Sequence, residues 1–246
     1  MIPPSDRIVL PDSNMNTPTQ PEPTVQITRD GPYVVSGSLP LSVETIGTNR
    51  EGESIKWKAG QKFPAQATYA LCRCGKSGTK PFCDGTHSKV AFDGAETASR
   101  EKYVDQAKVM RGPMMTLTDA EGLCAFARFC DPNGQVWNLV NQTDDPAART
   151  TFVQEACDCP SGRLVAWDNA TGKAVEPKHE PSAALVEDPA KHCSGPIWLR
   201  GGVQVIGADG FKYERRNRVT LCRCGASQNK PFCNGAHAAI RFNGQA

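Results

Sequence analysis

The chain has 246 residues, 28 basic and 26 acidic side chains, and a formal net charge of +2. This balance gives no electrostatic reason to expect nucleic acid as a partner, and no run of about 18 apolar residues predicts a membrane span. The N-terminus lacks a basic start followed by an apolar run, so no secretory signal is expected and the predicted compartment is the cytoplasm. In that reducing environment, the 11 cysteines predict metal ligands in preference to disulfides.

The first predicted elements are an arm and a hairpin. Residues 1–25 are rich in Pro, Ser, Thr and Asn, a composition typical of a disordered N-terminal arm. The segment from Thr24, TVQITRDGPYVVSG, alternates apolar and polar residues, and its Asp30-Gly31 pair predicts a hairpin turn. A second Asp-Gly pair, Asp209-Gly210, predicts another turn near the C-terminus.

The sequence contains an internal repeat. The segment LCRCGKSGTKPFCDGTH at Leu71–His87 recurs as LCRCGASQNKPFCNGAH at Leu221–His237, and a fainter match lies upstream of each copy. After the histidine the copies continue as KVAFDG and AIRFNG, whose alternation predicts a further strand. Each repeat therefore predicts a small β unit built around a metal loop, and two such units packed together would be more stable than one.

Each long motif carries three cysteines and one histidine in the order C-x-C-x8-C-x3-H. The candidate ligands are Cys72, Cys74, Cys83 and His87 in the first copy, and Cys222, Cys224, Cys233 and His237 in the second. Thiolates and a neutral imidazole suit zinc or an iron–sulfur cluster. Zinc sites usually separate their cysteine pairs by two or more residues, so the single intervening residue favours a two-iron cluster. One iron would take the close Cys pair and the other the remaining Cys and His, and a structural zinc site is the alternative.

Both loops resemble the CDGSH iron–sulfur family, whose pattern is C-x-C-x2-[ST]-x3-P-x-C-D-G-[STA]-H. The first copy matches throughout, whereas the second carries Asn234 at the position equivalent to Asp84. The resemblance implies two [2Fe–2S] clusters that are redox-active, acid-sensitive and sometimes transferable. Family members with one motif form a dimer through swapped strands, so a chain with two motifs is expected to be a monomer that holds an internal pseudo-dimer.

The middle of the chain differs in character. A helix is predicted at Asp145–Ala156, capped by Asp144 or Asp145 and followed directly by Cys157. The remaining thiols resemble a bacterial ferredoxin loop, C-x2-C-x2-C with a distant Cys-Pro, in which Ala127 occupies the central ligand position. The implied ligands of this third cluster are Cys124, Cys130 and Cys159.

Three thiolates favour a [3Fe–4S] cluster in this segment. A [4Fe–4S] cluster would require a fourth thiolate from Cys157 or Cys193. The alternative is that these cysteines are buried or idle thiols, since free cysteine behaves as a small hydrophobic residue. His179 and His192 lie in polar, Pro-containing stretches and are expected on the surface.

These features together predict an α+β, mainly β fold. Two small CDGSH-type units, residues 26–100 and 181–246, would pack as an internal pseudo-dimer around a ferredoxin-like segment, residues 101–180. The expected function is electron transfer or redox relay with redox partner proteins. The alternatives are a labile cluster carrier for apo-cluster acceptors, a redox or pH sensor, and a zinc-stapled interaction module. No phosphate loop, nucleophile elbow or dinucleotide-binding motif is present, so no enzyme is predicted.

Overall fold

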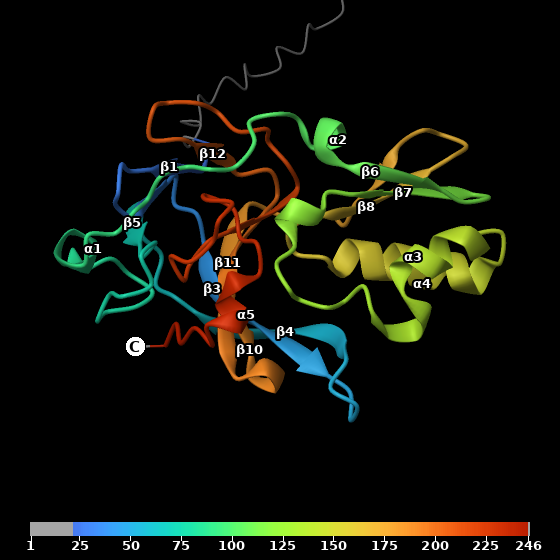
Figure 1. Cartoon of the computed structure of the whole chain (residues 1–246), viewed down its shortest axis with the longest axis horizontal. Coiled ribbons are helices and arrows are strands. Elements are labelled where there is room, and N and C mark those ends of the chain that lie inside the picture. Colours follow the sequence, from blue (N-terminus) through green and yellow to red (C-terminus); the bar gives the residue numbers. More distant parts are fainter. Residues whose placement is uncertain (1–21, 246) are drawn as a thin grey trace, which may run out of the picture.

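The structure is a computed structural model that describes residues 22–245. Most of the predicted N-terminal arm, residues 1–25, lies outside the described residues, and the first strand begins inside it at Thr24. The chain forms three sheets, of which the first two are built by the repeats and the third by the middle segment. Figure 1 shows the middle segment on the right and the two repeats together on the left.

The first sheet has the strand order β12-β1-β2-β5. Its strands are β1 (Thr24–Ile27), β2 (Tyr33–Ser36), β5 (Thr68–Leu71) and β12 (Gln204–Ile206). The hairpin predicted at Asp30-Gly31 is confirmed, because β1 and β2 pair antiparallel on either side of that turn. β12 comes from the other repeat and pairs parallel with β1.

The second sheet has the order β13-β11-β10-β3-β4 and also mixes the repeats. Its strands are β3 (Leu41–Thr48), β4 (Ser54–Lys62), β10 (Ser182–Asp188), β11 (Cys193–Arg200) and β13 (Arg218–Leu221). The two repeats meet where β3 pairs parallel with β10. Both sheets therefore exchange strands between the predicted units 26–100 and 181–246, which is the interwoven arrangement that an internal pseudo-dimer requires.

The main core lies between these two sheets. Side chains alternate across a strand, and the burial of β1 and β2 alternates accordingly, so one face of each strand turns inward. Tyr33 from the first sheet packs with Leu199 and Leu221 from the second in one cluster of buried residues. The Tyr33 hydroxyl donates to the Cys222 carbonyl at 2.9 Å, which ties the first repeat to the metal loop of the second.

The middle segment forms the third sheet, with two of its helices together on one side (Figure 1). Its strands are β6 (Lys108–Arg111), β7 (Met115–Asp119), β8 (Leu164–Asp168) and β9 (Ala174–Val175), and its α-helices are α2 (Tyr103–Gln106), α3 (Val136–Leu139) and α4 (Pro146–Asp158). The predicted helix is confirmed as α4, which extends two residues beyond the predicted end at Ala156. Asp145 caps it by accepting from the amides of Ala147 and Ala148.

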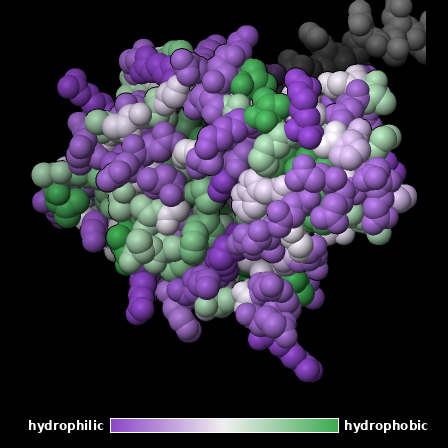
Figure 2. Space-filling view, turned by 45° about the vertical axis from the view of Figure 1, so that its right-hand side comes forward, coloured by the Kyte–Doolittle hydropathy of each residue, from purple (hydrophilic) through white to green (hydrophobic). Residues whose placement is uncertain are grey.

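Short helical turns complete the fold. The 3-10 turns are η1 (Glu121–Leu123), η2 (Pro132–Gly134), η3 (Val140–Gln142) and η4 (Pro189–Lys191), and the two turns that carry the motif histidines are α1 (Thr86–Lys89) and α5 (Ala236–Ala239). Among residues 22–245, no helix is both long and apolar enough to cross a membrane. Figure 2 shows a mostly polar surface on which apolar side chains gather in the left half of the view.

The strand predicted after each motif histidine is wrong. KVAFDG and AIRFNG begin at the end of a helical turn and continue without strand structure. The same contact between an arginine and a phenylalanine occurs in both repeats. The guanidinium of Arg223 lies 5.7 Å from the ring centroid of Phe242 in the second, and that of Arg73 lies 5.5 Å from the ring centroid of Phe92 in the first. The apolar residue of the alternation thus packs on an arginine of the metal loop instead of joining a sheet.

Candidate iron–sulfur sites

The two metal loops fold in the same way. β5 leads directly into Cys72, whose amide donates to the Pro81 carbonyl at 2.8 Å, while the Cys83 amide donates to the Ala70 carbonyl at 2.9 Å. The equivalent bonds of the second loop, from Cys222 to Pro231 and from Cys233 to Thr220, measure 2.8 and 2.9 Å. These bonds fold each loop back on itself and bring the third cysteine beside the end of the strand that leads into the first two.

In each loop the structure brings the four predicted ligands together as two close pairs. We call them site 1 (Cys72, Cys74, Cys83 and His87) and site 2 (Cys222, Cys224, Cys233 and His237). The two thiols of the C-x-C pair lie 3.7 Å apart in site 1 and 3.9 Å apart in site 2. The third thiol lies 3.3 Å from the histidine Nδ1 in site 1 and 3.4 Å in site 2.

These distances fit ligands that share one metal. Two sulfurs bound to one tetrahedral metal at about 2.3 Å lie about 3.8 Å apart, and a sulfur and a nitrogen lie somewhat closer. Among the described residues, however, no group of three or more Cys, His, Asp or Glu side chains converges on one position that could hold a metal ion. The four side chains of each loop therefore form two pairs, each close enough to bind one metal.

Backbone amides point toward the proposed sulfur ligands. The amides of Lys76 and Gly85 lie 3.5 Å from the sulfurs of Cys74 and Cys83, and the Gly235 amide lies 3.4 Å from Cys233. Such N–H···S hydrogen bonds favour the thiolate form and are one of the factors that set the potential of a cluster.

The acidic position of the motif differs between the two loops. The Asp84 carboxylate accepts from the Thr86 amide at 3.0 Å and from the Gly78 amide at 2.7 Å. These bonds, with that to Thr86 the strongest, hold the pKa of Asp84 below its usual range. The Asn234 side chain accepts from the Ala236 amide at 3.2 Å, so it makes the bond equivalent to that between Asp84 and Thr86 without bringing a charge.

The two sites differ most in their exposure to solvent. Cys83 and His87 are half-buried, whereas Cys233 and His237 are each 3% exposed. Desolvation by this burial lowers the pKa of His237 to about 4. The loop between Cys124 and Cys130 contributes to the burial, because it lies against Gly235 in the histidine turn of site 2.

A third site lies in the middle segment. We call it site 3 (Cys124, Cys130 and Cys159), since these three predicted ligands line one small cavity. Phe126 and Arg128 have positive φ angles of 56° and 63°, so the chain between the first two cysteines winds around the cavity. Ala127, at the predicted central ligand position, also lines it.

The other thiols lie outside this cavity. The Cys157 thiol donates to the Val175 carbonyl at 3.5 Å, so the structure does not bring this candidate fourth ligand to site 3. Cys193 is buried beside Asp188 and His192 at a different surface hollow. His192 is exposed, as predicted, but His179 is half-buried because its ring packs edge-on against Trp198 at 5.9 Å.

Sequence reasoning missed the arginines that surround these sites. Arg73 and Arg223 stand between the first two cysteines of each loop and are buried, at 1% and 4% exposed. Arg223 pairs with Glu187 at 2.8 Å, and Arg73 donates to the carbonyls of Thr28 and Gly94. The signal was available, because C-R-C recurs in both copies. These buried arginines tie each metal loop to neighbouring backbone and side chains.

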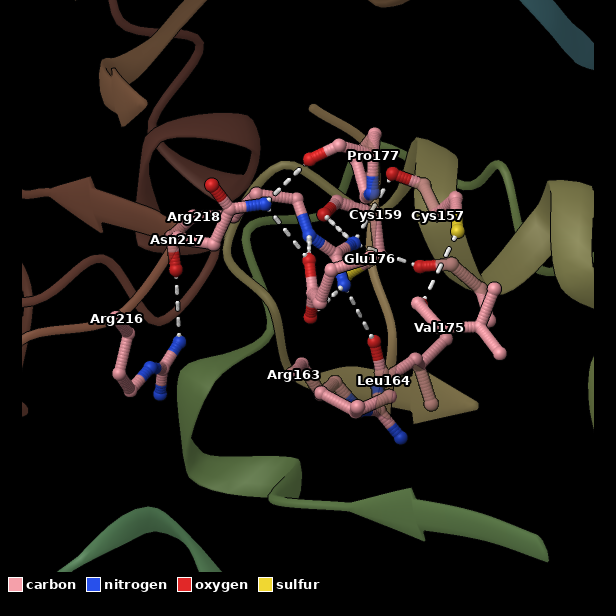
Figure 3. A network of polar contacts seen from close by, with 12 residues as sticks. Cys157, Cys159, Arg163, Leu164, Val175, Glu176, Pro177, Arg216, Asn217 and Arg218 are labelled. Carbon is pink, nitrogen blue, oxygen red and sulfur yellow. Dashed lines mark hydrogen bonds and ion pairs between the residues drawn. The ribbon is translucent and has the colours of Figure 1, made fainter. Parts of the chain in front are cut away.

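Arg218 lies among the backbone carbonyls around the site 3 ligand Cys159 (Figure 3). Its buried guanidinium pairs with Glu176 at 2.7 Å and donates to the carbonyls of Ala156 and Cys159 at 2.7 and 2.6 Å. The arginine therefore caps the C-terminal end of α4, just before the site 3 ligand. Four residues after Arg218 the same chain reaches Cys222 of site 2.

The comparisons with known proteins agree with this geometry. Residues 30–88 and 194–238 match the family model described as iron-binding zinc finger CDGSH type. Residues 110–169, between them, match the model described as divergent 4Fe-4S mono-cluster. Searches of the curated proteins and of the solved structures found no match. The chain therefore contains two CDGSH-type segments on either side of a divergent 4Fe-4S segment, and it is an iron–sulfur-binding protein.

Proposed function

We propose that this protein transfers electrons through two [2Fe–2S] clusters, at sites 1 and 2, and a [3Fe–4S] cluster at site 3. The observation that carries the proposal is the pairing of ligands in sites 1 and 2, where Cys–Cys and Cys–His pairs lie 3.3 to 3.9 Å apart at separate positions. Each pair suits one iron of a two-iron cluster. When bound, the clusters would supply one-electron redox chemistry, and the protein would supply ligands, N–H···S bonds and burial.

The proposal for site 3 depends on its number of thiols. Three cysteines line its cavity, and Ala127 occupies the position where a fourth ligand would be expected. Three thiolates suit a cubane-type cluster that lacks one iron, and the matching family model is described as divergent 4Fe-4S mono-cluster. No catalytic role is proposed. The redox partner proteins, the cytoplasmic location and the monomeric state stay predictions from the sequence.

Metal analysis tests the proposal directly. Anaerobically purified protein is expected to contain about seven irons per chain, with matching sulfide, and to show the EPR signals of both cluster types. His87→Ala and His237→Ala should each alter the visible spectrum or remove iron. A colourless preparation loaded with zinc, or histidine variants with an unchanged chromophore, would overturn the proposed ligation.

Cys157 and Cys159 provide a matched pair for testing site 3. Cys159→Ala is expected to remove the third cluster, because this thiol lines the cavity, and the iron content should fall by about three per chain. Cys157→Ala changes a cysteine two residues away that bonds the Val175 carbonyl, so it should leave the iron content unchanged. Equal iron loss in both variants would show that the assignment of ligands is wrong.

The exposure of site 1 favours a second function, delivery of a cluster to another protein. Cys83 and His87 are half-buried, so an acceptor can approach the site 1 ligands, whereas Cys233 and His237 are covered. Incubation with an apo-ferredoxin distinguishes the two functions. Prompt appearance of the acceptor's holo-spectrum favours a carrier, and retention of all clusters favours electron transfer.

A further inference from the structure

Sites 1 and 2 touch through their backbones. A Cβ atom added at Gly75 would lie 2.5 Å from the Cys224 carbonyl oxygen, and one added at Gly225 would lie 2.6 Å from that of Cys74. Such distances are far below van der Waals contact, so only glycine permits this approach. Each glycine directly follows a proposed ligand and faces a carbonyl of a ligand of the other site. One through-space step therefore separates the ligand sets of sites 1 and 2.

Sites 2 and 3 touch in a second place. A Cβ atom at Gly235 would lie 3.3 Å from the Cys124 carbonyl oxygen and 3.3 Å from the Phe126 Cβ. Cys124 is a proposed ligand of site 3, and Gly235 lies between the site 2 ligands Cys233 and His237. Again, one through-space step and two residues of chain join the two ligand sets.

Buried polar contacts hold this second junction in place. Arg128, from the site 3 loop, pairs with Asp188 at the end of β10 at 2.6 Å, with side chains 13% and 2% exposed. The same guanidinium donates to the Phe126 carbonyl at 2.9 Å. Arg218 fixes the other side of site 3 by capping α4. The middle segment is therefore fastened to the second repeat on both sides of the cavity.

The three sites consequently lie in series. Figure 1 shows α1, which carries His87, at the left edge, α5, which carries His237, in the centre, and the middle segment on the right. The contacts link site 1 to site 2 and site 2 to site 3. Site 2 is also the more buried of the two CDGSH-type sites, whereas site 1 can be reached from solvent. Site 2 therefore lies in the interior, in contact with both other sites.

We propose that site 2 is the obligatory intermediate of an intramolecular electron path that joins site 3 to site 1. The proposal rests on the proposed function. With clusters bound, one electron would pass from the reduced cluster held by the site 3 cysteines to the oxidised cluster held at site 2, and from there to the oxidised cluster held at site 1, or in reverse. No bond forms or breaks. One-electron redox proteins act as donor and acceptor at the two ends. Electron transfer slows steeply with the length of the through-space gap, so the two glycine junctions set the path.

EPR relaxation of the fully reduced protein tests the order of the sites. Cys159→Ala removes the cluster of site 3, and we expect the site 2 signal to saturate at lower microwave power than in the wild type, while the site 1 signal is unchanged. Cys83→Ala, which removes site 1, is the matched control and should leave the coupling between sites 2 and 3 in place. A change in the site 1 signal on loss of site 3, or no change at site 2, would overturn the serial order.

Freeze-quench EPR tests the passage of electrons. After mixing with less than one equivalent of dithionite, the wild-type protein should reach its equilibrium distribution of electrons within the mixing time. In Cys233→Ala, which lacks site 2, sites 1 and 3 should equilibrate slower by orders of magnitude, independently of protein concentration. Equally fast equilibration would overturn the proposal. Iron and sulfide analysis of each variant separates the two failures, because missing clusters at site 1 or site 3 in the wild type would overturn the proposed function as well.

Discussion

At the scale of single residues, Glu155 is a buried carboxylate with an unfavourable environment. It is 3% exposed, and neither carboxylate oxygen has a hydrogen-bond partner among the residues that the structure describes. Desolvation raises the pKa of Glu155 to about 8. This pKa lies above the value of about 4.3 expected in the unfolded chain. The stability of the folded protein is therefore highest below about pH 4, where Glu155 is protonated in both states, and it falls as the pH rises toward 8.

Glu155→Gln should therefore stabilise the protein in a pH-dependent way. The glutamine has the same shape and cannot ionise, so its advantage over the wild type should grow from about pH 5 to about pH 8 and then level off. Each unit of pKa shift corresponds to about 1.4 kcal/mol. Urea unfolding of both proteins across this range measures the difference, and an advantage that stays constant with pH would contradict the burial argument.

At this scale most ligands could be predicted from the sequence, but the orientation of Cys157 and the contacts of Arg218 could not. Cys72 and its seven partners follow from residue type and spacing, which are local features of the chain. Cys157 stayed open as a ligand because its direction depends on two further residues of helix in α4 and on Val175, which comes from a separate strand. The partners of Arg218 lie 42 to 62 residues away, so no local pattern indicated its role.

At the scale of elements, the contact between the two metal loops predicts unequal effects of two glycine substitutions. Gly75 and Gly52 have similar positive φ angles of 74° and 83°. A Cβ atom added at Gly75 would collide with the Cys224 backbone, whereas one added at Gly52 would have no atom within 4 Å. Gly52→Ala should cost about 1 kcal/mol from backbone strain alone. Gly75→Ala should cost clearly more and weaken clusters in both loops, as measured by thermal unfolding and visible absorbance. Equal costs would show that the loops do not touch.

The capping of α4 by Arg218 predicts another matched pair. Arg218→Ala leaves Glu176 and several carbonyls without their buried partner, so we expect a loss of about 3–5 kcal/mol and release of the site 3 cluster. Arg215→Ala removes an exposed ion pair with Glu22 and should leave the stability nearly unchanged. Urea unfolding of both variants measures these values, and a small effect at Arg218 would contradict its structural role.

Local signals predicted those elements whose structure is decided locally. The Asp30-Gly31 hairpin and the Asp145-capped helix follow from turn and capping residues within a few positions. The strand predicted from KVAFDG and AIRFNG failed because a buried arginine from the metal loop, distant in sequence, offers Phe92 and Phe242 a better contact than a sheet edge. Alternation alone does not identify the surface against which an apolar residue packs.

At the scale of the whole molecule, the inserted segment breaks the symmetry of the pseudo-dimer. The repeated motif predicted two equivalent units, and the exchanged strands β3 and β12 join them as expected. Neither copy of the motif indicated that the middle segment would cover one site and leave the other open. That outcome depends on the contact between Gly235 and the loop at Cys124, which lie more than a hundred residues apart.

This asymmetry predicts that the two [2Fe–2S] clusters are lost at different rates. A chelator reaches the half-buried Cys83 and His87 of site 1, whereas Cys233 and His237 of site 2 are each 3% exposed. Loss of visible absorbance with an iron chelator at neutral pH should therefore have two phases of similar amplitude for these clusters. Cys233→Ala, which lacks site 2, should keep the fast phase alone, and Cys83→Ala, which lacks site 1, the slow phase alone. A single rate common to the wild type and both variants would mean that the middle segment does not protect site 2.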